Sequence, residues 1–128
     1  MSGPAKDAAY YGRPRREMRR FVPAEARRIL DVGCGAGAFG AGLKDERPGL
    51  EVWGVEMDPE AAARARTVLD RVLEGDAAGV APTLAGERFD AIVLNDVLEH
   101  VLEPEALLAL LRPLLADGGR LVASVPNI

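Results

Sequence analysis

The chain has 128 residues, 48% of them hydrophobic, and a formal net charge of −4. This length fits one domain with a substantial core, and we expect neither a membrane span nor a signal peptide. The single cysteine and single histidine exclude an internal disulfide and a His/Cys zinc cluster, so the sequence predicts no metal site and a reducing cytoplasm.

Charge is unevenly distributed along the chain. Residues 1–28 contain eight Lys and Arg against three Asp and Glu, whereas residues 29–128 contain eight against seventeen. The basic part is either an arm that attracts an anionic substrate or nucleic acid, or the solvated face of a short helix. We favour the helix and predict no nucleic-acid partner. We also predict two parts, an N-terminal arm with a short helix (1–28) and a domain (29–128).

The first elements follow from apolar spacing. Residues 1–9 show no periodicity, whereas residues 15–22 predict a short helix with Met18, Phe21 and Val22 on its apolar side, ended by a proline. A strand is then predicted over residues 28–32.

Four glycines follow this strand, at positions 33, 35, 37 and 40, before a helical pattern that runs to about residue 46. Strand, glycine turn and helix N-terminus together predict a nucleotide-like cofactor site, because bare backbone and unpaired N–H groups face the ligand. A turn that merely needs glycine is the structural alternative.

The turn leaves two cofactors open. The spacing Gly35-x-Gly37-x-x-Gly40, with Glu56 about 20 residues later, satisfies the dinucleotide fingerprint of NAD-binding domains. However, Asp31 at the end of the strand would repel a pyrophosphate and suits a cationic group, such as the amino group of a methionine moiety.

A second strand is predicted over residues 50–56, apolar on nearly every residue as in a strand covered on both faces. Asp58 and Pro59 predict a helix start, and the amphipathic spacing continues through Val68 and Val72. Glu56 has no such structural task, and an acid after the second strand of an open α/β sheet takes ribose hydroxyls. The neighbouring Met57 offers an apolar surface to an adenine ring.

Two further strands end in polar motifs. Residues 72–74 form a short strand before Gly75-Asp76-Ala77, and residues 78–87 are a loop or weak helix. Residues 89–94 form a buried strand that runs into Asn95-Asp96-Val97-Leu98-Glu99-His100-Val101.

These motifs, in this order, resemble the class I S-adenosylmethionine (SAM)-dependent methyltransferases. The glycine turn resembles the D-x-G-x-G-x-G core of their first motif, and Phe89 to His100 resembles their F-D-x-V-x-x-x-x-V-L-E-H motif. The resemblance implies that SAM is bound by Asp31, Gly33, Cys34, Gly35, Gly37, Glu56, Met57, Asp76, Ala77 and Asn95. It also implies that the N-terminal segment, through Tyr10, Tyr11 or Arg13, folds over the cofactor; packing of the arm on the body is the alternative.

The C-terminal part predicts a helix from Pro104, interrupted at Pro113 and ended by Asp117-Gly118-Gly119, and a last strand over residues 121–125. The resemblance implies a Rossmann-like, doubly wound parallel α/β sheet of order 3-2-1-4-5. The family's strands six and seven are missing, so we interpret the chain as truncated. The free edge of the last strand then predicts a homodimer.

The resemblance implies transfer of a methyl group from SAM to a small-molecule acceptor by in-line attack, which needs mainly proximity and alignment. His100 is the candidate general base, against the alternative of a residue that simply begins a helix. Two other functions stay open at this point: a non-catalytic SAM-binding module and an NAD-binding domain.

Overall fold

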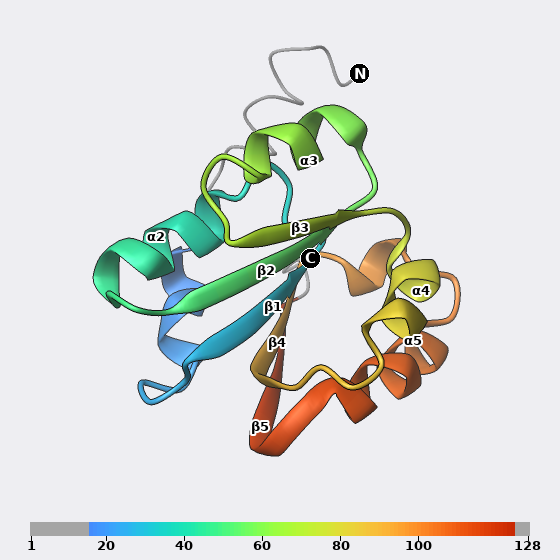
Figure 1. The fold of residues 1–128 in the computed structure, drawn as a ribbon. Coiled ribbons are helices and arrows are strands. Elements are labelled where there is room, and N and C mark those ends of the chain that lie inside the picture. The colour runs from blue at the N-terminus through green and yellow to red at the C-terminus, as the bar shows by residue number, and fades with distance from the viewer. Residues whose placement is uncertain (1–15, 125–128) are drawn as a thin grey trace.

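A five-stranded parallel sheet forms the centre of the molecule, with strand order β3-β2-β1-β4-β5 as the resemblance implied (Figure 1). The computed structural model describes residues 16–124, so the expectations for Tyr10, Tyr11, Arg13 and Val125 lie outside the described residues. The strands are β1 (Arg28–Val32), β2 (Glu51–Glu56), β3 (Arg71–Glu74), β4 (Phe89–Asn95) and β5 (Leu115–Ser124). The helices are η1 (Arg16–Phe21), α2 (Ala38–Glu46), α3 (Pro59–Ala65), α4 (Ala77–Val80), η2 (Ala81–Leu84), η3 (Leu98–His100), α5 (Pro104–Leu111) and η4 (Arg112–Leu114).

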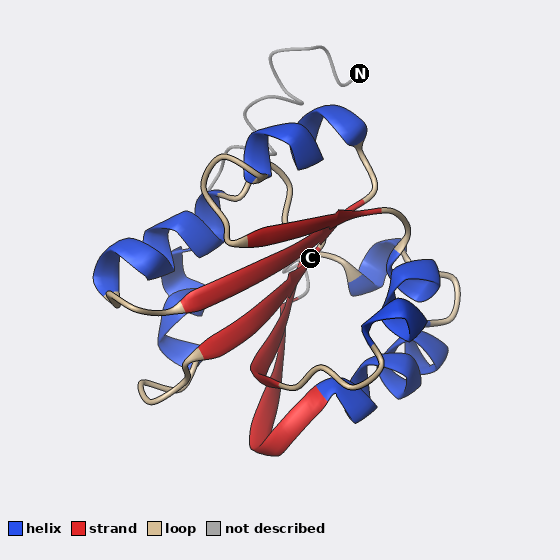
Figure 2. Cartoon of the chain, in the orientation of Figure 1, coloured by secondary structure: helices blue, strands red, loops and turns tan. Residues whose placement is uncertain are grey.

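Both faces of the sheet are covered, which explains why β2 and β4 are apolar on consecutive residues (Figure 2). Neighbouring residues of one strand point to opposite faces. Ile29 and Val52 therefore enter a core cluster closed by η1, α2 and α3. Leu30 and Trp53 enter a second cluster closed by α4, η2, α5 and η4. The sheet is thus the middle layer of three.

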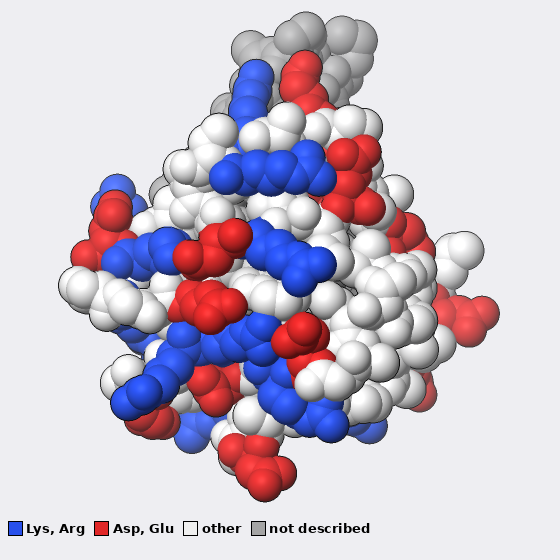
Figure 3. All heavy atoms as spheres, viewed as in Figure 1, with Lys and Arg blue, Asp and Glu red and all other residues white. Residues whose placement is uncertain are grey.

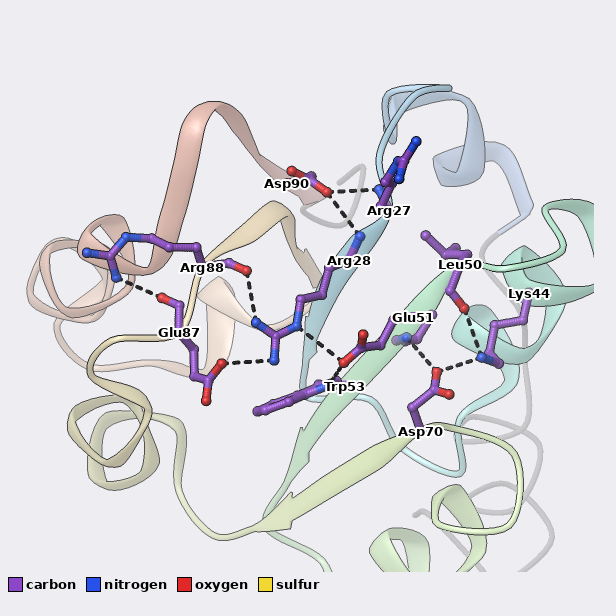
Figure 4. Close-up of polar contacts among 11 residues, drawn as sticks. Arg27, Arg28, Lys44, Leu50, Glu51, Trp53, Asp70, Glu87, Arg88 and Asp90 are labelled. Carbon is purple, nitrogen blue, oxygen red and sulfur yellow. Dashed lines mark hydrogen bonds and ion pairs between the residues drawn. The ribbon is translucent and has the colours of Figure 1, made fainter.

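Ionic contacts hold the amino ends of the strands together, away from the ends that carry the predicted site (Figure 4). The Asp90 carboxylate accepts from the backbone N–H groups of Arg27 and Arg28, at 2.8 and 3.0 Å. The Arg28 guanidinium pairs with Glu51 and Glu87. These contacts fix the starts of β1, β2 and β4 relative to one another, so the opposite ends of the strands are presented on a rigid base.

The segment before β1 is anchored on the C-terminus of α2. The Arg47 guanidinium donates to three backbone carbonyls of this segment, those of Arg19, Val22 and Pro23. Met18 and Val22 are buried as predicted. Phe21 is not on the apolar side as predicted: it is 46% exposed, and the Arg20 guanidinium lies over its ring, 4.9 Å from the centre.

The helix that begins after Asp58 is shorter than its apolar spacing predicted. Asp58 caps it as expected, because its carboxylate accepts from the N–H of Ala61 at 2.8 Å. However, α3 ends at Ala65, and Val72 lies in β3. Val68 is 42% exposed. The periodicity misled because Leu69 in the turn and Val72 in β3 are both buried and follow the helix at a spacing that a longer helix would also give.

The predicted end of the last helix was also wrong. Pro113 has no N–H to continue the ladder, so α5 ends at Leu111, and β5 begins after η4. Asp117-Gly118-Gly119 does not cap the helix but lies within β5. The pairing there jumps from Phe89 with Leu115 to Ala91 with Arg120. This irregularity takes up the extra residues, and Gly118 adopts a φ of +75°.

Candidate functional site

A cavity of about 1000 Å³ opens where the carboxyl ends of β1, β2, β3 and β4 meet. Its other wall comes from η3 and α5. Ten of the eleven residues predicted for the site line it, and the exception is Gly37. The lining members are Asp31, Gly33, Cys34, Gly35, Glu56, Met57, Asp76, Ala77, Asn95 and His100. Segments far apart in sequence are therefore brought to one place, as the strand order requires.

Asp31 is the most deeply buried charged group of the cavity. Only 2% of its surface is exposed, and its Oδ2 has no hydrogen-bond partner among the described residues. Burial, with a further contribution from the Glu56 carboxylate, raises the pKa of Asp31 from 3.8 to about 7. A buried carboxylate without a partner is costly. The site therefore provides a place for a cationic or hydrogen-bond-donating group of a ligand.

Glu56 joins the glycine turn to the start of α3. Its Oε1 accepts from the N–H of Gly35 at 2.8 Å, and its Oε2 accepts from the N–H of Asp58 at 2.9 Å. Each carboxylate oxygen has a second acceptor position, so these bonds leave capacity for ligand hydroxyls. We predicted Glu56 as a ligand-binding residue without a structural task; the absence of a structural task was wrong, because its carboxylate holds the turn and the start of α3.

The glycine turn is held by β2 as well. The N–H groups of Gly33 and Cys34 both donate to the Val55 carbonyl, at 2.7 and 3.0 Å. Gly33 has a φ of +73°, and a Cβ there would lie 2.7 Å from Val97 Cγ2. The Cys34 thiol is buried, and burial raises its pKa. Because the thiolate is the reactive form, Cys34 serves as a small packing residue of the turn.

Gly37 has a packing role at the start of α2. It is the N-cap of that helix, with a φ of 92°, and a Cβ there would lie 2.8 Å from Val68 Cγ2 and 3.3 Å from the Cα of Ala65. It lets α2 approach α3 closely. Its predicted contact with a cofactor rests on the sequence alone.

The rim beside β2 and β3 is formed by Met57, Asp76 and Ala77. Met57 is 67% exposed, so an apolar side chain stands in water beside the cavity. Asp76 precedes α4, and its exposed side chain makes no capping bond to that helix. Both side chains are therefore available to a ligand at this rim.

The end of β4 carries a backbone conformation that is unusual for a residue with a side chain. Asp96 has a φ of 59°, in the left-handed region that Asp tolerates better than most residues. Its N–H donates to Ser124 Oγ at 3.1 Å, and the Ser124 hydroxyl donates to Asp96 Oδ1 at 3.4 Å. Asn95 beside it has a buried Oδ1 without a partner among the described residues.

His100 ends η3 at the mouth of the cavity. Its side chain is 69% exposed, and its Nε2 lies 3.6 Å from Glu99 Oε2. The position allows His100 to reach a molecule that enters the cavity. Its role as general base stays a prediction.

The wall that α5 contributes was missed from the sequence. Glu103, Ala106 and Leu110 line the cavity, together with Leu102 in the preceding loop. Leu102 is fully exposed, and Leu110 is 40% exposed. A signal existed, since Leu110 falls outside the buried stripe of Leu107 and Leu111, but only the packing of α5 on the sheet shows that this side faces the cavity.

The composition of the walls discriminates between the two cofactors that the glycine turn left open. Carboxylates line the cavity at the ends of β1 and β2 and beyond β3, and no Lys or Arg among residues 16–124 lines it. A pyrophosphate would be placed against these carboxylates without a counter-charge. A ligand with a positive charge, ribose-type hydroxyls and a flat apolar ring fits the same groups.

Comparisons of the sequence and of the structure with known proteins point to the same family. A family model described as "Methyltransferase domain" matches residues 7–128. The "Ubiquinone biosynthesis O-methyltransferase" of Cereibacter sphaeroides is 33% identical over 122 residues, which cover 88% of this chain and 46% of that protein. The chain therefore spans less than half the length of this curated relative.

Two solved structures extend the likeness to the fold. The SAM-bound amino pentose methyltransferase CalS10 from Micromonospora echinaspora, involved in calicheamicin biosynthesis, is 30% identical with a TM-score of 0.74, and the likeness covers 100% of this chain and 58% of that one. A SAM-dependent methyltransferase from Archaeoglobus fulgidus is 26% identical with a TM-score of 0.71, and the likeness covers 88% of this chain and 51% of that one.

Within the part of the chain that the structure describes, no helix has the length and apolar character needed to cross a membrane.

Proposed function

The chain belongs to the class I SAM-dependent methyltransferase family, and from this premise we propose that it binds SAM in the strand-end cavity and transfers a methyl group to a small-molecule acceptor. The buried, unpartnered Oδ2 of Asp31 is the observation that carries the proposal. It supports a cofactor with a positively charged group and speaks against the NAD alternative, whose pyrophosphate is anionic.

The cavity supplies a group for each part of SAM. Asp31 holds the methionine amino group, Glu56 the ribose hydroxyls, and Asp76 with the backbone of Ala77 the adenine ring, beside Met57. The backbone of the glycine turn and Asn95 complete the contacts, through Gly33, Cys34 and Gly35. Each assignment is supported by a place on the cavity wall.

When bound, SAM supplies a methyl group that its sulfonium has already activated. The protein's own part is then to align the acceptor and to exclude water. His100, at the mouth, is placed to take a proton from an acceptor hydroxyl as the new bond to carbon forms. Asp96, held by Ser124, is a second polar group beside the same space.

Three finer points complete the proposal. We place the protein in the cytoplasm, because its single cysteine is a buried free thiol. Nucleic acid is not its partner, since the cavity walls carry carboxylates and would repel phosphates. Residues 1–128 by themselves form a homodimer, because β5 is at the edge of the sheet among the described residues.

Methyl transfer itself provides the test. The full-length protein is incubated with methyl-labelled SAM and a metabolite extract, and protein-dependent labelled products are counted. Labelled product that is lost in Asp31→Asn supports the proposal. The non-catalytic SAM-binding alternative predicts that SAM binds while no label leaves it.

A further inference from the structure

The cavity is lined by one sign of charge. Five carboxylates face it, whereas His100 is the sole basic side chain on its walls among the described residues. The acids are Asp31, Glu56, Asp76, Asp96 and Glu103. On the face shown in Figure 3, Lys and Arg are interleaved with Asp and Glu over the strands, whereas the side formed by α4 and α5 is mostly uncharged. On this face the Lys and Arg side chains therefore gather over the strands and not over α4 and α5.

The negative charge of Asp31 is not neutralised by any residue that the structure describes. It is 98% buried, lines the cavity, and leaves Oδ2 without a partner among the described residues. By contrast, acids elsewhere are neutralised within the protein: Glu51 and Glu87 both pair with Arg28. The cofactor is expected to carry a net single positive charge, from an ammonium, a sulfonium and one carboxylate, so Glu56, Asp76 and Glu103 leave the described walls of the cavity negative when it is filled.

The acid farthest along the chain, Glu103, stands on the side formed by η3 and α5. It lies there among apolar groups, since Leu102 and Leu110 line the cavity and are 100% and 40% exposed. A carboxylate or phosphate placed between these groups would lose its water and meet like charge. Like charges placed opposite each other at a binding surface disfavour the partner. An apolar molecule would instead gain by covering Leu102 and Leu110.

We propose that the methyl acceptor carries no negative charge and has an apolar part that packs against Leu102 and Leu110, so that the cavity rejects carboxylated and phosphorylated acceptors. This inference rests on the proposed function. It gives Glu103, which no motif indicated, a role in choosing the acceptor by charge.

Electrophoresis of labelled products tests the inference. The full-length protein is incubated with methyl-labelled SAM and a metabolite extract, and the products are separated at pH 7 against a control without protein. Label that stays at the origin, or moves to the cathode apart from SAM, supports the inference. Mild alkali is applied in parallel, because it releases methanol from methyl esters, the products of carboxylate acceptors. Label that moves to the anode, or that is released as methanol, overturns the inference. Such a result is expected if the basic residues in positions 1–15 of the sequence attract an anionic acceptor.

A charge reversal isolates the contribution of Glu103. In Glu103→Lys we expect the anionic fraction of labelled product to rise several-fold from the same extract. The matched control is Glu105→Lys, also exposed at the start of α5 but not on the cavity wall, which should leave the distribution unchanged. An unchanged distribution in Glu103→Lys overturns the role given to that residue. No labelled product from the wild-type protein removes the proposed function, and this inference with it, which is a different outcome from anionic product.

Discussion

Two acids at the ends of neighbouring strands dominate the site at the scale of single residues. Asp31 and Glu56 are both buried, and burial together with the Glu56 carboxylate raises the pKa of Asp31. Such a pair is unfavourable for the fold alone. The proposed binding of a ligand explains its presence, because stability is given up at a site where charge is needed.

Asp31→Asn should therefore stabilise the ligand-free protein, and more so at high pH. Because the folded pKa lies above the unfolded value, the folded chain keeps a proton between about pH 4 and pH 7 that the unfolded chain releases. The contribution of Asp31 to the free energy of unfolding thus falls as the pH rises through this window, by at most about 4 kcal/mol. Urea unfolding at pH 5 and pH 8 measures the effect. An offset between variant and wild type that is the same at both pH values would contradict it. Glu105→Gln, an exposed change on α5, is the control.

Glu56→Gln tests whether the turn depends on its two accepted hydrogen bonds. An amide oxygen keeps one of the bonds to Gly35 and Asp58, whereas the NH₂ group meets a donor. Losing a hydrogen bond to a charged group costs about 1.5–3 kcal/mol, so SAM affinity should fall tenfold or more and the Gly35 amide should exchange faster with solvent. Glu60→Gln, on the exposed side of α3, should change neither. If Glu56→Gln bound SAM as tightly as the wild type, the assignment of Glu56 to the ribose hydroxyls would be contradicted.

The elements differ in how far the sequence predicts them, and burial explains the difference. The strands next to the site were predicted almost to the residue, because β1, β2 and β4 are covered on both faces and form short apolar runs between turns. The end of α3 and the start of β5 were not predicted. Periodicity continues when a turn and a strand bury apolar residues at helix-like spacing, and a bulge of β5 around Gly118 has no local signature beyond its glycines.

The same contrast applies to the site. Acids at the ends of β1 and β2 could be placed from the sequence, because parallel strands bring their carboxyl ends to one edge. The wall of Leu102, Glu103 and Leu110 depends on how α5 packs across the sheet. The bonds from Glu56 to the turn likewise depend on side-chain geometry, which spacing does not contain.

Gly54→Ala should disturb the contact between β2 and the glycine turn. A Cβ at position 54 would lie 2.6 Å from Cys34 Sγ and 2.9 Å from Leu69 Cδ1. Overpacking of this kind typically costs about 1–3 kcal/mol, which urea unfolding would measure. Adding Cys34→Ala should recover part of the loss by removing the sulfur. Gly79→Ala, with open space around it in α4, should not destabilise; a loss equal to that of Gly54→Ala would show that glycine replacement alone is responsible.

At the scale of the whole molecule, β5 forms one edge of the sheet among residues 16–124. It pairs with β4 on one side, and Leu121 and Val122 face the two core clusters. The chain spans 46% of its curated relative from Cereibacter sphaeroides.

Residues 1–128 alone should associate through this edge. An unpaired strand edge offers N–H and C=O groups to another chain, and no lysine interrupts residues 121–124. Sedimentation at rising concentration should show a dimer. The Ser124 carbonyl accepts from Asp96 after β4, so the backbone of Ala123 faces the free edge, and Ala123→Pro, which removes an N–H from that edge, should weaken the dimer. A monomer up to high micromolar concentration, with the amides of residues 121–124 protected from exchange, would refute edge pairing.

The central claim is that the strand-end cavity binds SAM through the buried carboxylate of Asp31. Calorimetric titration of the wild-type chain and of Asp31→Asn with SAM and with NAD tests it most directly. The account predicts one-site binding of SAM, at least tenfold weaker in Asp31→Asn and weaker in the wild type as the pH falls below about 7, with no binding of NAD. Binding of NAD in place of SAM, or equal SAM affinity in the two proteins, would contradict it.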